Sequence, residues 1–382
     1  MRKINNWLFF PLYLSLLVGC QPDNEKNNST DNRVQRIDSL IESRNKQDLF
    51  HGAIVISQKG DIIYENYIGI ADRSWNIPIQ KEVKFDIASL NKSMISALTL
   101  KAVEEGKLGL NDRLVDLLEN FSFEGSFHPD ITLHQMLSHS SGLPDYDAIS
   151  EDLKANAFLE FKRLRFTNEE YVNFISKIGP VNAPGKQFYY SNFAYHLLAI
   201  ILEDTYQKPF RKILKEQLTE PLGLKNTVAE SRNERIIPKL ASAYNYQEDT
   251  KEWHENPFID LSLGRRIFST ASDLHRWAMM MDNPGYLSEQ SLELMQRNHL
   301  EGISENVSYG YGWVVFDPEN KTQMGNLQIE KPYIIHGGST DGYKAMLINI
   351  NEGEYIISFL SNVGNRTQEM HLAQEILKLL NL

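Results

Sequence analysis

Strand-like segments lie near both ends of this 382-residue chain, whereas its long middle has a mainly helical pattern. His51–Ser57 and Asp61–Ile68 flank a Gln-Lys-Gly turn, and their β-branched and aromatic residues predict a hairpin. Four short apolar runs near the other end are also typical of strands: Gly312–Phe316, Tyr333–His336, Lys344–Asn349 and Tyr355–Leu360. We therefore predict an α+β fold, with one antiparallel sheet built from both chain ends, flanking helices and an inserted, mostly helical lobe. A cleft between the lobes is the natural place for a site.

The first twenty residues are predicted to be a targeting segment. Arg2 and Lys3 precede an apolar run from Trp7 to Val18, which is too short to span a membrane as a helix. The run ends in Leu-Val-Gly-Cys at Cys20, which resembles the lipobox of bacterial lipoproteins. That resemblance implies cleavage before Cys20 and a diacylglycerol anchor on its thiol. An ordinary signal peptide with an incidental cysteine is the alternative.

This interpretation divides the chain into three segments. Residues 1–19 are the predicted lipoprotein signal peptide, residues 20–33 a flexible polar tether, and residues 34–382 a single large domain. Because Cys20 is the only cysteine, the domain can contain no internal disulfide. We expect a cell-envelope protein that is anchored to a membrane by its lipid and is either periplasmic or surface-exposed.

The charge and the missing motifs exclude several function classes. The formal net charge is -11, and removing the two cations of the leader brings it to about -13, so bulk attraction to nucleic acid is not expected. The sequence has no H-E-x-x-H motif, no phosphate-binding loop and no G-x-S-x-G elbow, and we predict neither a metal nor another cofactor. Arg265 and Arg266 could bind an anionic group, but two adjacent arginines are more often part of a solvated loop, which is what we predict. The oligomeric state stays open.

The first candidate motif is Ser89-Leu90-Asn91-Lys92, at the start of a predicted helix over Ser89–Glu105 that ends before Gly106. Residues three apart lie on one helix face, so Lys92 can reach the Ser89 hydroxyl. A serine needs a nearby base to act as a nucleophile, and a desolvated lysine can be that base. The same spacing occurs in Ser43–Lys46, which lacks matching surroundings and reads as a solvated pair.

The second and third motifs are Tyr190-Ser191-Asn192 and His336-Gly337-Gly338-Ser339. Tyr190 follows a Pro-Gly turn and precedes a helix, where an adjacent ammonium could lower the pKa of its phenol and let it relay protons. The Asn192 amide can donate to and accept from a substrate amide. Glycines after a strand permit close approach of a backbone or a ligand, and the N–H of Ser339 could join that of Ser89 as an oxyanion hole. Two other Y-x-N triplets, at Tyr64 and Tyr171, show that the triplet alone is uninformative.

Taken in order, these motifs resemble those of the β-lactamase-related serine hydrolases: class C β-lactamases, low-molecular-weight penicillin-binding proteins, D,D-peptidases and esterases of that fold. Residues 137–143 resemble the family's H-T-S-G-L loop, and residues 309–313 its Y-G-x-G-W segment. The resemblance implies a β-lactamase/transpeptidase-like fold. It makes Ser89 the nucleophile, Lys92 and Tyr190 the base and proton relay, and Asn192, His336, Gly338 and Ser339 substrate-binding residues. His139, in the first of these segments, is predicted to be structural.

One departure from the family's pattern concerns substrate choice. His336 and Gly337 replace the lysine and threonine of K-T-G, so a permanent positive charge is lost or becomes pH-dependent. We therefore expect a serine hydrolase that forms an acyl-enzyme on Ser89 and cleaves D-amino-acid peptides, small esters or, weakly, β-lactams. The alternative is a catalytically silent module that binds cell-wall peptide without turnover. Because a silent site has no need of Ser89, Lys92 and Tyr190 together, we favour the enzyme.

Overall fold

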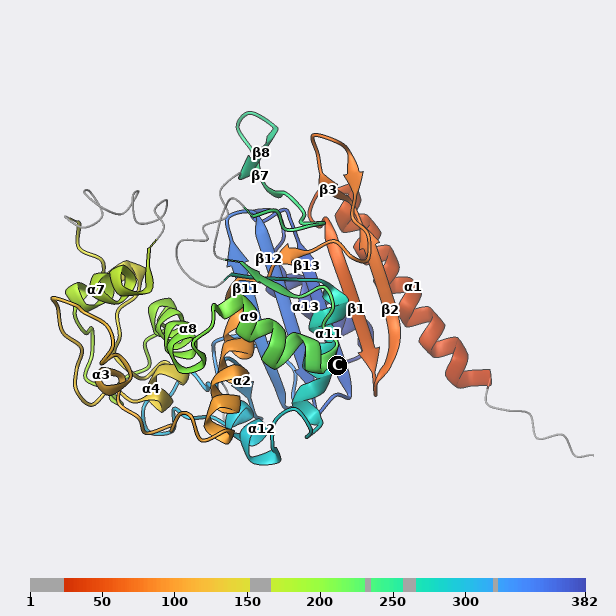
Figure 1. Ribbon diagram of the computed structural model, residues 1–382. Helices are drawn as coiled ribbons and strands as arrows, with labels where there is room; N and C mark the ends of the chain where they lie inside the picture. Colours follow the sequence, from red (N-terminus) through yellow and green to blue (C-terminus); the bar gives the residue numbers. More distant parts are fainter. Residues whose placement is uncertain (1–23, 152–165, 231–234, 257–265, 319–321) are drawn as a thin grey trace, which may run out of the picture.

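A six-stranded antiparallel sheet forms the centre of the protein, with the strand order β10-β11-β12-β13-β1-β2 (Figure 1). The computed structural model describes residues 24–151, 166–230, 235–256, 266–318 and 322–382. The sheet strands are β1 (Gly52–Gln58), β2 (Asp61–Ile68), β10 (Val314–Phe316), β11 (Tyr333–Thr340), β12 (Tyr343–Ile350) and β13 (Tyr355–Ser361). β1 pairs with β13 from Gly52 opposite Ser361 to Gln58 opposite Tyr355. The prediction that both chain ends build one antiparallel sheet is therefore confirmed.

Alternate residues of the central strands point into two separate cores. Ile54 and Ile56 of β1 join the core beneath α1 (Asn24–Lys46) and α13 (Glu369–Leu380). Ala53 and Val55, between and beside them, join the larger core on the opposite face. That face is covered by α11 (Ala271–Met279), which packs against β1 and β13. The sheet is thus a middle layer between two helical layers.

The helical lobe is inserted between the N-terminal hairpin and the C-terminal strands. Its helices are α2 (Asn91–Glu104), α3 (Leu114–Leu117), α4 (Leu133–Leu137), α7 (Asn168–Ile178), α8 (Asn192–Tyr206), α9 (Phe210–Leu214), α10 (Glu220–Leu222) and α12 (Glu289–Gln296). The middle of the chain also holds short strands that the sequence pattern did not predict: β3 (Ile70–Asp72), β4 (Ile77–Pro78), β5 (Phe85–Asp86), β6 (Val228–Glu230), β7 (Ala243–Gln247), β8 (Glu252–Asn256) and β9 (Arg266–Ser269). Strands of two to five residues are too short to establish an alternating pattern.

The N-terminal helix differs from the prediction. α1 begins at Asn24, inside the segment 20–33 that we predicted to be a flexible tether. Ile37 and Ile41 anchor α1 in the core, and extending an anchored helix adds one hydrogen bond for each residue fixed. Cys20 and the predicted signal peptide lie outside the described residues.

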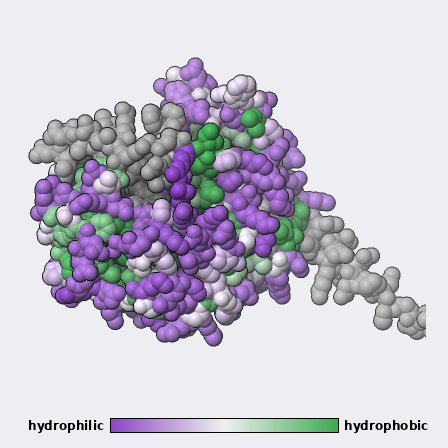
Figure 2. All heavy atoms as spheres, viewed as in Figure 1, coloured by the Kyte–Doolittle hydropathy of each residue, from purple (hydrophilic) through white to green (hydrophobic). Residues whose placement is uncertain are grey.

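The surface matches the polar composition. The face in Figure 2 is mainly hydrophilic, with apolar side chains in separate patches. Within the described ranges, no helix combines the length and the apolar character that a bilayer crossing requires.

Candidate active site

The serine of the first motif lies on a tight turn that a buried carboxylate holds. A 3₁₀ turn over Ala88–Leu90 precedes α2, so the predicted helix begins in this tighter form. Ala88 has φ +48°, a left-handed conformation that is strained for a residue with a side chain. The Ala88 N–H donates to Asp86 Oδ1 at 2.7 Å, and Arg266 Nη1 donates to Asp86 Oδ2 at 3.0 Å. Asp86 is 1% exposed, so this ion pair fixes the turn that presents Ser89.

Arg266 therefore contradicts the prediction of a solvated arginine pair. It begins β9, which pairs with β5 two residues further on, and its guanidinium meets the buried Asp86 carboxylate. The reason is that a buried charge is retained where it is paired and hydrogen-bonded. Arg265 lies outside the described residues.

Lys92 reaches Ser89 as the spacing predicts. Its Nζ lies 3.2 Å from Ser89 Oγ, and it donates to Asn192 Oδ1 at 2.8 Å. Burial lowers the pKa of Lys92 to about 7, with the Asp145 charge acting in the opposite direction and Arg266 lowering it further. A lysine with such a pKa can hold and release a proton near neutrality.

Tyr190 lies beside this pair, but its pKa moves the opposite way from the prediction. Lys92 Nζ is 4.9 Å from the centre of the Tyr190 ring, and the Tyr190 phenol is hydrogen-bonded to Ser89. Burial raises the pKa of Tyr190 well above its ordinary value, although the bond to Ser89 opposes this. The expected lowering by a neighbouring ammonium is wrong because desolvation outweighs it. Tyr190 is therefore a neutral phenol that can donate a proton.

Asn192 is the first residue of α8 and is held from two sides. Its side-chain Nδ2 donates to Asp145 Oδ2 at 3.0 Å, and its backbone N–H donates to Asp145 Oδ1 at 3.2 Å. Its Oδ1 accepts the bond from Lys92. Burial raises the pKa of Asp145 to about 6, while Lys92 and the bonds from Asn192 oppose the rise. Asn192 thus links a lysine and a carboxylate that both titrate near neutrality.

The loop over residues 137–143 contacts and supports the segment 189–191, which contains Tyr190. The His139 carbonyl accepts from the Tyr189 N–H at 2.8 Å, and His139 Nδ1 accepts from the Ser191 N–H at 3.1 Å. The buried imidazole also lies 4.2 Å from the Tyr190 ring, measured between ring centres. Burial lowers the pKa of His139 well below its ordinary value, so the ring is neutral. These contacts hold Tyr190 in place and agree with the predicted structural role.

His336 is buried beside Lys92 rather than displayed as a cation. Its Nδ1 lies 2.7 Å from the Gly337 carbonyl, which can only accept, so Nδ1 carries the proton. Its Nε2 then accepts from the Tyr309 hydroxyl at 3.1 Å. Burial lowers the pKa of His336 to about 3, and Lys92 contributes to the shift. Of the two predicted outcomes, loss of the charge is the one that the structure supports.

β11 meets the serine turn through a glycine. A Cβ on Gly338 would lie 2.2 Å from the carbonyl oxygen of Ile87, two residues before Ser89, so only glycine permits this approach. Ser339 follows on the exposed side of the strand. β10 pairs only with residues 333–335 of β11, and no other strand in the described ranges covers that edge beyond Ile335. An extended ligand could add to this free edge.

Contacts thus gather Ser89, Lys92, Tyr190 and Asn192 at one place, and β11 packs directly behind the serine turn. Sequence reasoning missed Asp86 and Asp145. The only local signal for Asp145 is its position two residues after the 137–143 segment, and nothing in the sequence pairs Asp86 with Arg266.

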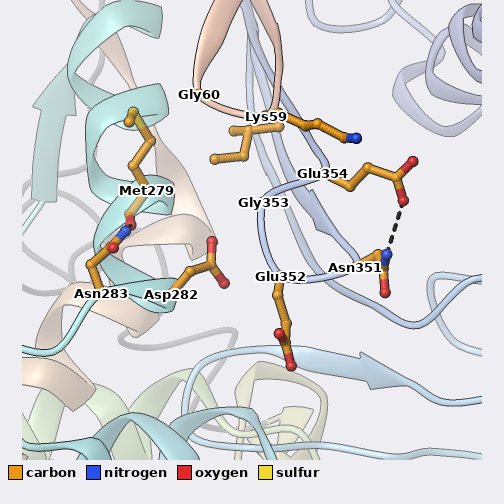
Figure 3. A pocket seen from close by; sticks show the side chains of 10 residues that line it. Lys59, Gly60, Met279, Asp282, Asn283, Asn351, Glu352, Gly353 and Glu354 are labelled. Carbon is orange, nitrogen blue, oxygen red and sulfur yellow. Dashed lines mark hydrogen bonds between the residues drawn. The ribbon is translucent and has the colours of Figure 1, made fainter.

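A separate cavity of about 650 Å³ contains no residue of the three motifs (Figure 3). It lies at the β1–β2 and β12–β13 turns, opposite the end of α11, and its acidic lining comes from Asp282, Glu352 and Glu354. Across the described ranges, no group of three or more ligating side chains could hold a metal ion. The cavity therefore holds none of the residues that we predicted for catalysis.

Comparisons with known proteins agree with this arrangement. The family model described as Beta-lactamase matches residues 37–381. Penicillin-binding protein 4* of Bacillus subtilis is 24% identical, over 91% of this chain and 75% of its own length. The octameric penicillin-binding protein homologue from Pyrococcus abyssi superposes with a TM-score of 0.73 at 22% identity, covering 91% of this chain and 77% of that one. EstCE1, described as a hydrolase with promiscuous acyltransferase activity, gives a TM-score of 0.72 at 18% identity, covering 93% and 99%. Since the family model spans nearly the whole chain, the protein belongs to the Beta-lactamase family.

Proposed function

We propose that the protein is a serine hydrolase that cleaves ester or amide bonds through an acyl-enzyme on Ser89. The observation that carries this proposal is the 3.2 Å approach of Lys92 Nζ to Ser89 Oγ, in surroundings that bring the pKa of Lys92 to about 7. A serine with an adjacent base of this kind has the basic requirement of nucleophilic catalysis. Membership of the Beta-lactamase family supports the same reaction class.

The proposed reaction has two halves. In the first, Ser89 Oγ forms a bond to the substrate carbonyl carbon while the free amine of Lys92 takes the hydroxyl proton. The carbonyl oxygen gains the negative charge, which the N–H groups of Ser89 and Ser339 stabilise. Collapse expels an amine or alcohol, which takes a proton from the Tyr190 hydroxyl, while the Lys92 ammonium restores the proton of the phenol and becomes a free amine again. In the second half, water gives a proton to Lys92 as it attacks the acyl carbonyl, and Lys92 passes that proton to Ser89 Oγ as the acid product leaves.

The neutral His336 directs the choice of substrate. Because its ring is buried and uncharged, it supplies no cation for a substrate carboxylate. Esters and amides that carry no carboxylate, including those of D-amino acids, are therefore preferred, and β-lactams react weakly. The edge of β11 beyond Ile335, which no described strand covers, offers backbone pairing for a peptide-like substrate. We further propose that a lipid on Cys20 keeps the enzyme in the cell envelope.

Intact mass of the wild-type protein after exposure to a fluorophosphonate, and separately to a penicillin, tests the proposal. We expect a single fluorophosphonate adduct that is absent in Ser89→Ala, and little or no penicillin adduct. A persistent penicillin adduct that depends on Ser89 would move the substrate class toward peptidases. No adduct from either reagent would contradict the hydrolase and favour the catalytically silent binding module.

A further inference from the structure

We propose that Asp145 is a positioning residue of this site, which fixes the Asn192 amide toward Lys92 and stabilises the protonated form of Lys92 during acylation. The inference rests on the proposed hydrolase function. It concerns a residue that none of the three motifs contains. Asp145 lies two residues after the 137–143 loop and contacts the N-terminus of α8.

The hydrogen bonds determine which way the Asn192 amide points. Asp145 accepts from both the backbone N–H and the side-chain Nδ2 of Asn192, at 3.2 and 3.0 Å. A carboxylate has no proton to donate, so the NH₂ end of the amide must face Asp145. The oxygen end is then left for Lys92, which donates to it at 2.8 Å. Without the carboxylate, a flipped amide would turn its NH₂ group toward the ammonium.

The charges around Lys92 give Asp145 a second effect. The titratable and charged groups that face Lys92 from the elements packed around it are Asp145, Arg266, His139, His336, Tyr190 and Tyr195. Burial keeps both histidines and both tyrosines uncharged near neutral pH. Of these six groups, Asp145 therefore supplies the negative charge and Arg266 the positive one. When Ser89 loses its proton to Lys92, the new ammonium lies one amide away from the Asp145 carboxylate, and this stabilises it.

Asp145→Asn tests both effects on the full-length protein. The new amide can accept from the Asn192 N–H and also donate to the Asn192 oxygen, which favours the flipped amide. We expect hydrolysis of a small uncharged ester to fall by about tenfold or more at pH 8. We also expect the acid limb of the rate profile, measured between about pH 5 and 9, to move to lower pH because Lys92 loses the charge that raises its pKa. Asp145→Ala removes the charge without a competing amide, so the limb should move similarly with a smaller loss of rate.

Asp147→Asn is the matched control. It removes the same charge from an exposed side chain that lies two residues further along the chain. The acid limb of its pH–rate profile should lie at the same pH as in the wild-type protein. A second control places Asp145→Asn in an Asn192→Ala background. There the loss of rate should shrink to about twofold, since there is no amide left to flip, while the shift of the limb persists.

The outcomes separate this inference from the function on which it rests. Thermal unfolding and a Ser89-dependent fluorophosphonate adduct establish that each variant is folded and that the hydrolase assignment holds. With those in place, an unshifted acid limb and an equal loss of rate in both backgrounds would overturn the role of Asp145 alone. If the wild-type protein forms no adduct at Ser89, the hydrolase function fails first.

Discussion

Two pairs of residues in this protein share the same S-x-x-K spacing on a helix and differ in almost everything else. Ser43 and Lys46 lie at the end of α1, where both side chains are exposed. Ser43 Oγ accepts from Gln47, and Lys46, whose side chain is 75% exposed, pairs with Glu42 at 3.1 Å. Ser89 and Lys92 lie around the start of α2, beside Asn192 of α8, and Lys92 is only 3% exposed. The spacing brings a lysine within reach of a serine, whereas burial is what changes the chemistry of the lysine.

The Y-x-N triplets repeat this lesson. The Tyr64 hydroxyl donates to Asp38 and accepts from Asn66, in a local cluster between β2 and α1. Tyr171 is buried inside α7. Of the three triplet tyrosines, Tyr190 is the one that lies against both Lys92 and Ser89. A short motif therefore identifies a site only where separate elements converge on it.

Exchanging the two serines for alanine is the strongest test of the comparison. Ser89→Ala should abolish the fluorophosphonate adduct and ester hydrolysis, because no other described serine has a buried lysine at 3.2 Å. Ser43→Ala should leave both unchanged. The measurement is intact mass together with the rate of ester hydrolysis. An adduct that survives in Ser89→Ala would remove the distinction between the two pairs.

Exchanging the lysines should give the next largest effect. Lys92→Gln removes the proposed base, and we expect hydrolysis to fall by about 10²–10⁴-fold. Lys46→Gln should have no effect, since that lysine is solvated. In the wild-type protein the rate should increase as the pH rises through about 7, because only the free amine of Lys92 can take the proton from Ser89. A rate that is independent of pH in this range would argue against Lys92 as the base.

The sequence was sufficient for the sheet and the motifs but not for their supports. Apolar runs such as Tyr355–Leu360 predict the sheet, and the order of the motifs predicts which residues meet around Ser89. The support of the serine turn depends on Asp86 and Arg266, which are 180 residues apart and meet only because β5 and β9 pair. The pKa values of Tyr190 and His336 depend on burial, which motif spacing does not report.

That long-range support gives a stability prediction. Asp86→Ala should lower the free energy of unfolding by about 3–5 kcal/mol, because it leaves Arg266 without its carboxylate and the strained Ala88 turn without its acceptor. Asp116→Ala is the control. Its pair with Arg113 is about half exposed, with side chains 53% and 54% accessible, so solvent screens it and its loss should change stability far less. Urea unfolding of both variants measures the difference. Equal losses of unfolding free energy would show that the buried Asp86–Arg266 pair stabilises the fold no more than an exposed pair does.

Adjacent glycines on β11 provide the finest comparison. Gly338→Ala would place a Cβ 2.2 Å from the Ile87 carbonyl, so β11 and the serine turn must separate; we expect a loss of about 1–3 kcal/mol in unfolding free energy and a slower acylation of Ser89. Gly337→Ala meets nothing nearer than Met346 Cε at 3.7 Å and should change stability by less than about 0.5 kcal/mol. Urea unfolding and the rate of fluorophosphonate labelling measure both. If Gly337→Ala slows labelling as much as Gly338→Ala, contact between the strand and the serine turn is not what requires glycine here, and the open position at Gly337 would instead be one that the substrate occupies.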